Sequence, residues 1–255
     1  MFSNTFDKNL EIMDTLQKNT IGEYVAQDFR TAALFSKYKI DFCCKGNKTL
    51  DEVCEAKGLD VNKIEKEIDA VLTSNSSNEI DFKSFSPNLL IDYILETHHE
   101  YIESKTPILL MYLDKLCKVH GERHPELFEI NNLFKIASSE LLNHLQKEEV
   151  VLFPFIKTMT NAIKNNETIQ QPGFGTVENP IAMLKQDHET EGDLFVKISA
   201  LTNEYNPPID ACETYKVTFA MLKEFEQDLH KHIHLENNIL FHKAVELEES
   251  FNVLD

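Results

Sequence analysis

The 255-residue sequence contains no tryptophan, only 7 glycines and no long uninterrupted apolar run. A helix that spans a bilayer needs roughly 20 mostly apolar residues, so we expect no membrane-spanning helix. Few glycines, together with many Leu, Lys and Glu residues in heptad-like stretches, are typical of an all-helical protein. A chain of this length can bury a sizeable core, as one large domain or as a small domain joined to a medium one.

Positive charge is also scarce, since 25 Lys and Arg residues stand against 43 Asp and Glu residues and give a formal net charge of −18. Such an acidic surface repels phosphate backbones and anionic leaflets, so we expect neither a nucleic-acid nor a membrane partner. The five cysteines form a sparse, odd-numbered set. The stretch "MFSNTFDKNLEIMD" lacks the basic start and apolar core of a signal peptide. These features predict reduced thiols in a cytoplasmic protein.

The first third of the sequence is predicted to form a small helical domain at residues 1–75. Its stretches are short and amphipathic, and in one of them Thr49 and Glu52 fit a capping box while Gly58 fits a helix stop. The following stretch, "TSNSSNEIDFKSFS", is polar and has no helical period. We therefore expect a linker at residues 76–85.

The remainder, residues 86–255, contains four long helical stretches joined by shorter connections. Two of these stretches begin with a cap residue followed by proline, at Ser86 and at Asn179. A cap residue with proline at the first helical position is a helix start signal. Four long helices in one chain predict an antiparallel four-helix bundle.

An internal repeat lies in this C-terminal region. "HLQKEEVVLFP" begins at His144 and "HIHLENNILFH" begins at His232, and both read His-x-x-x-Glu-x-x-x-Leu-Phe. A further histidine precedes each copy, because His99 lies 45 residues before His144 and His188 lies 44 residues before His232. Each half therefore reads as a helical hairpin with one histidine on its first helix and a His-x-x-x-Glu pair on its second.

The same repeat resolves the histidine-rich stretch "HKHIHLENN". Residues four apart share a face of a helix, which pairs His230 with His234 and His232 with Glu236. Only the pair of His232 and Glu236 has a counterpart in the first copy. We therefore exclude His230 and His234 from the predicted site.

Two such hairpins in one bundle would bring four histidines and two glutamates toward one centre. A single histidine, or a single His-x-x-x-Glu pair, is usually solvated or part of a surface ion pair, but a duplicated pair with matching partners is hard to obtain by chance. Imidazole and carboxylate together suit iron, and less selectively zinc or manganese. The spacing predicts a metal centre on six residues: His99, His144, Glu148, His188, His232 and Glu236.

The motifs "YKIDFCCKGNKTL", "THHEY", "HLQKEEVVLFP", "KQDHETEG" and "HIHLENNILF" resemble those of the Repair of Iron Centers family, the YtfE/ScdA group of hemerythrin-like di-iron proteins. The resemblance covers nearly the whole chain. It implies two non-haem iron ions, bridged by oxo and carboxylate groups and held by the same six residues. His98, which adjoins His99, remains the alternative ligand at that position.

The resemblance also implies a function, which is the repair of iron–sulfur clusters damaged by oxidative and nitrosative stress. Repair would proceed by iron delivery, by nitric oxide handling at the di-iron site, or by both. The implied partners are iron–sulfur proteins as clients, nitric oxide or oxygen as small ligands, and a second copy of the chain in a homodimer.

The vicinal pair Cys43–Cys44 supports two interpretations. Adjacent cysteines in a reducing compartment are most often half-buried thiols without a chemical role. Here they precede a predicted helix, whose N-terminus favours a thiolate, and the resemblance implies a redox or iron relay. The family pattern has two glycines after the pair, whereas this chain has Lys45 at the first of these positions.

Other residues are assigned from their helical positions. Glu140 and Asp187 are candidates for orienting a ligand imidazole, although Glu140 is equally well explained as a solvated residue. Glu149 is expected at the surface, and His120 and His124 are expected to be exposed or capping in a turn. The remaining cysteines fall at apolar helical positions and are expected in the core: Cys54, Cys117 and Cys212.

Two rival functions stay open. One is a hemerythrin-type protein that binds or senses oxygen or nitric oxide without turnover, although a thiol-bearing N-terminal domain argues against a plain carrier. The other is a structural zinc or manganese bundle that holds a partner. The candidate enzyme activity is that of a nitric-oxide-reducing oxidoreductase at the non-haem di-iron centre, with Cys43 and Cys44 as electron or iron partners.

Overall fold

The computed structural model describes residues 19–74 and 80–252, and the regular elements in these ranges are all helical. The predicted all-α class is confirmed. The chain divides into two compact units, unit 1 (Met1–Phe85 with His234–Ile239) and unit 2 (Ser86–Ile233 with Leu240–Asp255). The predictions for residues 1–18 and for residues 76–79 of the linker lie outside the described residues.

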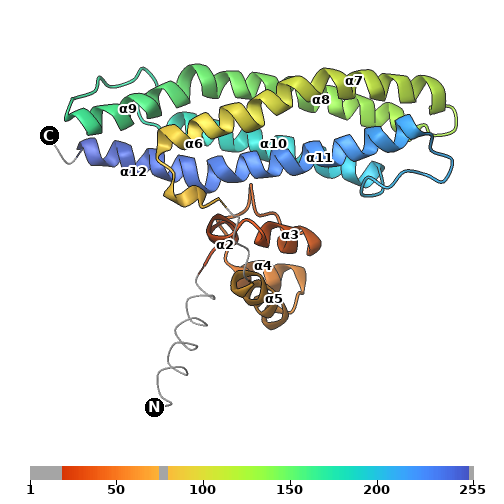
Figure 1. The fold of residues 1–255 in the computed structure, drawn as a ribbon, viewed down its shortest axis with the longest axis horizontal. Helices are drawn as coiled ribbons and strands as arrows, with labels where there is room; N and C mark the ends of the chain where they lie inside the picture. Colours follow the sequence, from red (N-terminus) through yellow and green to blue (C-terminus); the bar gives the residue numbers. More distant parts are fainter. Residues whose placement is uncertain (1–18, 75–79, 253–255) are drawn as a thin grey trace, which may run out of the picture. The chain divides into compact units, whose positions relative to one another are not determined.

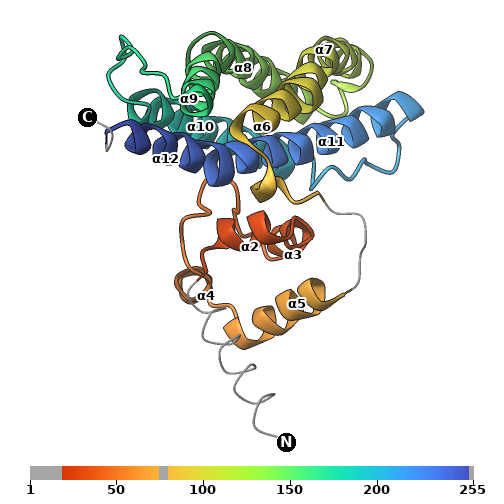
Figure 2. The same cartoon turned by 60° about the vertical axis from the view of Figure 1, so that its left-hand side comes forward.

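Unit 1 is built from short helices (Figure 2): α2 (Ile21–Gln27), α3 (Thr31–Lys37), α4 (Leu50–Lys57), α5 (Val61–Thr73) and the 3-10 turn η1 (Phe82–Ser84). Thr20 and Thr49 cap α2 and α4 with full capping boxes, and the two residues also pair as an isolated antiparallel bridge. Gly58 ends α4 with φ 64°, a left-handed conformation that favours glycine. The cap and the stop predicted for α4 are therefore confirmed.

Unit 2 contains four long helical stretches that run along one axis (Figure 1). In chain order they are α6 (Pro87–Ile94), η2 (Leu95–His99) and α7 (Glu100–His120); α8 (Glu126–Lys147), η3 (Glu148–Leu152) and α9 (Phe153–Asn165); α10 (Glu178–Leu201); and α11 (Glu213–Leu235), η4 (Glu236–Leu240) and α12 (Phe241–Asn252). Residues His234–Ile239 of the last stretch are counted in unit 1. Ser86 caps the first stretch by accepting a hydrogen bond from the Leu89 backbone N–H. The predicted four-helix bundle is present, and α8 packs against both α7 and α10.

Three of the four stretches are interrupted by a single π-helical turn. A π turn accommodates one extra residue, so the side chains on either side of it are rotated relative to a regular α-helix. The turn η2 ends at His99, while η3 begins at Glu148 and η4 begins at Glu236. Both copies of the sequence repeat therefore carry a π turn at the same position, on the glutamate.

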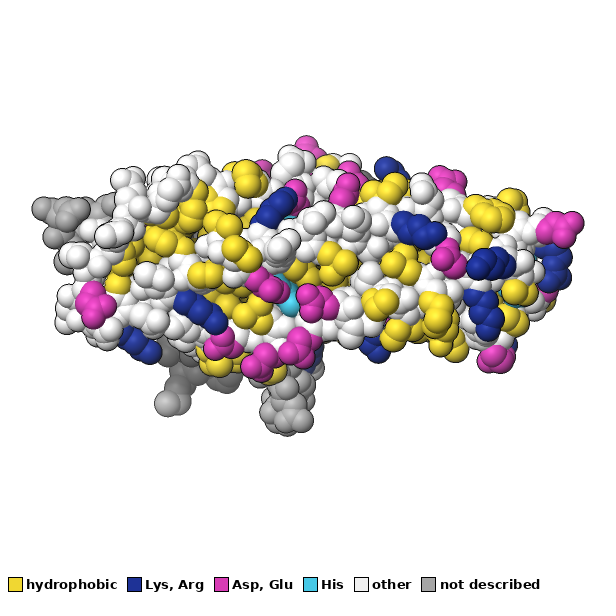
Figure 3. Space-filling model, turned by 90° about the horizontal axis from the view of Figure 1, so that it is seen from above, with side chains coloured by type: hydrophobic (Ala, Val, Ile, Leu, Met, Phe, Trp, Pro, Cys, Tyr) yellow, Lys and Arg dark blue, Asp and Glu magenta, His cyan; other side chains and the backbone are white. Residues whose placement is uncertain are grey.

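Aromatic side chains fill part of the bundle core. Phe225 contacts both Phe134 and Phe195, with ring centroids 5.4 Å and 5.7 Å apart respectively. On the face shown in Figure 3, acidic and basic side chains are dispersed among apolar ones, and histidine occupies only small patches. Within the described ranges, none of the helices combines the length and the apolar character that a bilayer crossing requires.

Candidate metal centre

Six buried side chains converge inside the bundle. They form two groups, and within each group one potential ligand atom per residue lies within 4.8 Å of the others. One group consists of His99, Glu148, His232 and Glu236, and the other of His144, Glu148, His188 and Glu236. Each of the six is at most 2% exposed. The structure thus brings together the six residues that the repeat singles out, and it shares both glutamates between the two groups.

The histidines face one another in pairs through their Nε2 atoms. The Nε2 atoms of His99 and His232 are 3.2 Å apart, and those of His144 and His188 are 3.1 Å apart. Two nitrogen ligands that bind one ion at about 2.1 Å and at right angles are about 3 Å apart. Each pair therefore has the separation of neighbouring ligands on a single ion.

The Glu148 carboxylate lies between the two histidine pairs. Its Oε1 is 3.2 Å from His144 Nε2, and its Oε2 is 3.5 Å from His99 Nε2. This side chain is fully buried, and a buried carboxylate is costly unless it is paired or binds a cation. Each oxygen of this carboxylate therefore faces a different histidine pair.

Carboxylates outside the two groups face the rear nitrogens of the ligand histidines. His99 Nδ1 donates to Glu149 Oε1 at 2.7 Å. His144 Nδ1 lies 3.7 Å from Asp187 and 3.6 Å from Glu191. Such partners fix the tautomer and the orientation of a metal-binding imidazole. The side chain of Glu149 is 40% exposed as expected, but its contact with His99 was not anticipated from the sequence, which favoured Asp187 and the exposed Glu140.

Glu191 is the main residue near the centre that sequence reasoning missed. It is 1% exposed, and neither of its carboxylate oxygens has a hydrogen-bond partner among the described residues. Burial raises the pKa of Glu191 to about 7, although His144 and His188 oppose this shift. Its position three residues after His188 places it on the same helical face. That spacing alone could not identify Glu191, because the equivalent position in the other half of the repeat, three residues after His99, is Ile102.

The alternative ligand His98 belongs to neither group. Its Nδ1 donates to Asp228 Oδ1 at 2.9 Å, and its ring stacks on that of His232 with centroids 5.8 Å apart. The geometry therefore favours His99. His230 is also outside both groups. His234, in unit 1, packs between Phe rings and receives a hydrogen bond from Asn238 Nδ2 at 3.0 Å.

A separate thiol cluster lies in unit 1, in the loop before α4. Asp41, Cys43 and Cys44 offer ligand atoms within 4.8 Å of one another, and the two sulfur atoms are 3.7 Å apart without a disulfide. Cys43 is buried, Cys44 is half-buried, and Asp41 Oδ1 accepts hydrogen bonds from both backbone N–H groups. Asn237 Nδ2 donates to the Cys43 carbonyl at 3.1 Å, a contact that the sequence did not reveal.

The expectation that the following helix favours a thiolate is wrong for Cys43. The hydrogen bond with Cys44, burial and the Asp41 charge together raise the pKa of the Cys43 thiol well above its usual range. The raised pKa favours the protonated thiol at Cys43. Any metal binding or nucleophilic attack by this sulfur must first remove that proton.

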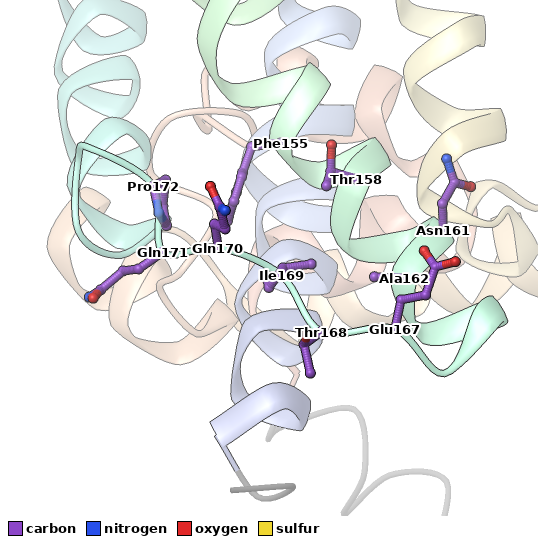
Figure 4. Close-up of a pocket in the computed structure, with 10 residues that line it drawn as sticks. All are labelled: Phe155, Thr158, Asn161, Ala162, Glu167, Thr168, Ile169, Gln170, Gln171 and Pro172. Atoms are coloured by element: carbon purple, nitrogen blue, oxygen red, sulfur yellow. The ribbon is translucent and has the colours of Figure 1, made fainter.

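A hollow of about 590 Å³ lies in unit 2, between α9 and the loop that follows it (Figure 4). Its lining includes Phe155, Thr158, Asn161 and Gln170, and Glu167 is its one ionisable side chain. A single carboxylate without histidine or cysteine is a poor set of transition-metal ligands. The hollow therefore does not compete with the His/Glu cluster as a metal site.

Comparison with known proteins agrees with both parts of this description. A family model described as a domain of unknown function (DUF542) matches residues 17–72, and one described as the hemerythrin HHE cation binding domain matches residues 90–244. The iron–sulfur cluster repair protein ScdA of Staphylococcus haemolyticus is 30% identical over 89% of this chain and 97% of its own length.

Two proteins named iron–sulfur cluster repair protein YtfE show the same relationship. The one from Enterobacter sp. is 32% identical over 88% of this chain and 96% of its own length. The one from Dickeya chrysanthemi is 31% identical over 89% of this chain and 96% of its own length. The chain therefore belongs to the ScdA/YtfE family and combines a DUF542 domain with a hemerythrin HHE cation-binding domain.

Proposed function

We propose that the six converging side chains hold two iron ions, and that this centre serves the repair of iron–sulfur clusters damaged by oxidative and nitrosative stress. The observation that carries the proposal is the pair of four-residue groups that share two buried glutamates. Two sets of nitrogen ligands with two common carboxylates suit a pair of ions. The relatives named as iron–sulfur cluster repair proteins supply the functional context.

The chain's own residues divide the work at this centre. The four histidines would each bind one ion, and Glu148 and Glu236 would bridge the ions together with an oxo group. Glu149 would hold the imidazole of His99 in a fixed orientation through its hydrogen bond, and the Glu191 carboxylate lies 3.6 Å from His144 Nδ1. Bound iron would supply one-electron chemistry and open positions for nitric oxide or oxygen.

The thiol cluster has a separate part in the proposal. We assign Cys43 and Cys44 to a redox or iron relay in the N-terminal domain, residues 1–75, which the linker at 76–85 joins to the di-iron domain at 86–255. Cys44 is the more accessible sulfur, and Asp41 is placed to accept the Cys43 proton, since the thiol already donates to Asp41 Oδ1 at 3.4 Å. The proposal places the protein in the cytoplasm, as a homodimer, with iron–sulfur proteins as clients.

Metal analysis of protein purified without added metal tests the centre. We expect two irons per chain and near-ultraviolet absorption from an oxo-bridged diferric pair. Zinc or manganese in place of iron, without that absorption, would instead support the rival structural bundle. Reactivation of a nitric-oxide-damaged iron–sulfur enzyme then tests repair. The iron-loaded protein should restore its activity, and Glu148→Ala protein should not.

A hemerythrin-type binding protein is the second candidate, and the match to the HHE cation-binding domain favours it specifically. The two functions differ in turnover. Reversible oxygen binding by the reduced protein, without consumption of nitric oxide, would favour a carrier or sensor. Continued nitric oxide consumption with an added reductant would favour a nitric-oxide-reducing oxidoreductase.

A further inference from the structure

A cysteine–histidine pair lies at the start of the fourth helical stretch of the bundle. The Sγ atom of Cys212 is 3.2 Å from His120 Nε2. Cys212 is exposed, whereas the other four cysteines are buried or half-buried, and His120 is only 5% exposed. Both observations overturn the expectation of a core Cys212 and of an exposed or capping His120, while Cys54 and Cys117 are buried as expected.

The backbone around Cys212 favours negative charge on its sulfur. Cys212 immediately precedes α11, and its carbonyl accepts the helical hydrogen bond from the Lys216 N–H at 3.1 Å. The residue in this position adjoins the unpaired N–H groups of the first turn, where the helix dipole stabilises an anion. Reactive cysteines typically occupy helix starts beside a cationic or basic group.

The histidine is held in place to act as the base. Its ring packs edge-on against Tyr215, which lies one turn into α11, with centroids 5.4 Å apart. The buried Nδ1 has no hydrogen-bond partner among the described residues. For Nε2 to accept the thiol proton, the neutral ring carries its own proton on Nδ1.

The charged neighbours are already paired with each other. Asp210 lies 3.0 Å from both Arg123 and His124, and Glu213 lies 2.7 Å from Lys216. Arg123 and Lys216 thus pair with the two acids closest to Cys212 in sequence. The site therefore keeps an accessible sulfur without an unpaired carboxylate next to it in the chain.

The pair is remote from the metal centre. Cys212 and the ligand His232 lie 20 residues apart along the same helix, which is about 30 Å at 1.5 Å per residue. The mechanism proposed for the centre makes no use of this sulfur. An accessible nucleophile with an oriented base is the usual arrangement of an activated thiol.

We propose that Cys212 and His120 form a thiol-exchange site that reacts with low-molecular-weight disulfides. His120 Nε2 takes the proton of Cys212, and the thiolate attacks one sulfur of the small disulfide. A new S–S bond forms at Cys212 as the original S–S bond breaks. The second sulfur leaves as a thiolate and takes the proton from His120. The result is a reversible mixed disulfide at the start of α11.

Full-length, metal-loaded protein tests the proposal with two disulfides, oxidised glutathione and an aromatic disulfide that releases a coloured thiolate. We expect one fast-reacting thiol, assigned to Cys212 by peptide mass mapping and absent from Cys212→Ser. Cys117→Ser, which removes a buried thiol of the same bundle end, should keep the fast reaction. Fast labelling at Cys44 with none at Cys212 would overturn the proposal.

The role of His120 is tested by the pH profile. Wild-type protein should react at pH 6.5 at least tenfold faster than His120→Gln, whose rate should rise about tenfold per pH unit as the thiolate fraction grows. Equal profiles would contradict the role of His120. If His120→Gln does not fold, native protein is compared with the same chain in urea. Cys212 must then react at least tenfold faster in the native state, or the proposal fails.

Discussion

Glu148 and Glu236 are the two residues on which both ligand groups depend. Each belongs to both groups, whereas each histidine belongs to one. In the proposed two-iron centre, removal of a shared carboxylate would affect both ions and would leave them with one fewer buried counter-charge.

Alanine substitution of either glutamate should abolish the binding of paired irons. We expect Glu148→Ala and Glu236→Ala to retain at most one iron per chain and to lose the near-ultraviolet band of a bridged pair. Iron analysis and absorption spectroscopy are the measurements. His230→Ala and His234→Ala are matched controls on the same helix and should keep both irons. A His234→Ala protein that loses its metal while His232→Ala retains it would refute this ligand assignment.

Glu226 lies outside the centre and should make stability depend on pH. Burial raises its pKa to about 7, from an ordinary 4.5, although the neighbouring Tyr205 hydroxyl opposes the shift. A raised pKa in the folded state means that the stabilisation is complete below pH 4.5 and is lost as pH rises through 7. Glu226→Gln should therefore gain about 1–2 kcal/mol relative to wild type between pH 5 and pH 8.

Urea unfolding of the metal-free protein at both pH values measures this difference. Glu249→Gln, which changes an exposed carboxylate near the end of α12, is the control and should follow wild type. A constant difference between Glu226→Gln and wild type across this range would show that Glu226 does not titrate in the folded protein.

At the scale of residues, the sequence predicts those site residues whose relative positions follow from helical spacing. His144 and Glu148 are four residues apart, as are His232 and Glu236. A helix therefore places each pair on one face, whatever packs against that helix. The partners Glu149 and Asp228 were not found, because their contacts with the histidines depend on which helices pack together. Such contacts join residues 50 and 130 positions apart.

At the scale of elements, the π turns are the feature that distinguishes this bundle from four regular helices. The turn η3 starts at Glu148, so the ligands before it and the apolar side chains after it have different rotations about the helix axis. In a regular α-helix, one of these two sets would turn by about 100° away from the bundle core.

Deletion of Val150 should convert η3 into regular α-helix. Val150 is 68% exposed, so its removal costs little burial, but the register of the helix changes. We expect the deletion variant to keep its helical circular dichroism and to bind less than half of the wild-type iron. Val150→Ala keeps the chain length and should bind iron normally. Full iron binding by the deletion variant would show that the turn is dispensable.

Some helix ends were predictable from the sequence, whereas the π turns were not. The start at Ser86 is confirmed, but the one predicted at Asn179 is wrong, because α10 begins at Glu178 after Val177 and has no side-chain cap. Thr49 with Glu52, Gly58, and Ser86 with Pro87 are local chemical signals, since each satisfies free backbone groups of its own helix. A π turn has no such signal. Its extra residue rotates the following side chains about the helix axis. The neighbouring helices and the ligand cluster require that rotation, so the turn depends on tertiary packing.

At the scale of the whole molecule, metal binding should determine the stability of unit 2. The cluster buries two carboxylates among four imidazoles, and a buried charge without a partner is destabilising. A ligand that binds only the folded state adds about 4 kcal/mol when it is present at 1,000 times its dissociation constant. Removal of the metal should therefore lower the melting temperature markedly.

Differential scanning calorimetry of iron-loaded and chelator-treated protein measures this effect. Glu148→Gln removes the negative charge while keeping the shape of the side chain, so its metal-free form should melt higher than metal-free wild type. A metal-free wild-type protein that melts at the temperature of the loaded form would show that the cluster is not a structural metal site.

The near-complete burial of all six cluster residues has a kinetic consequence. With each side chain at most 2% exposed, a competing chelator cannot reach a bound ion until the helices part. Local opening, and not the strength of the competitor, would then limit release. The rate of iron loss should reach a plateau as chelator concentration rises. Under the proposed role in iron delivery, a client protein would have to loosen the bundle before it could receive the metal.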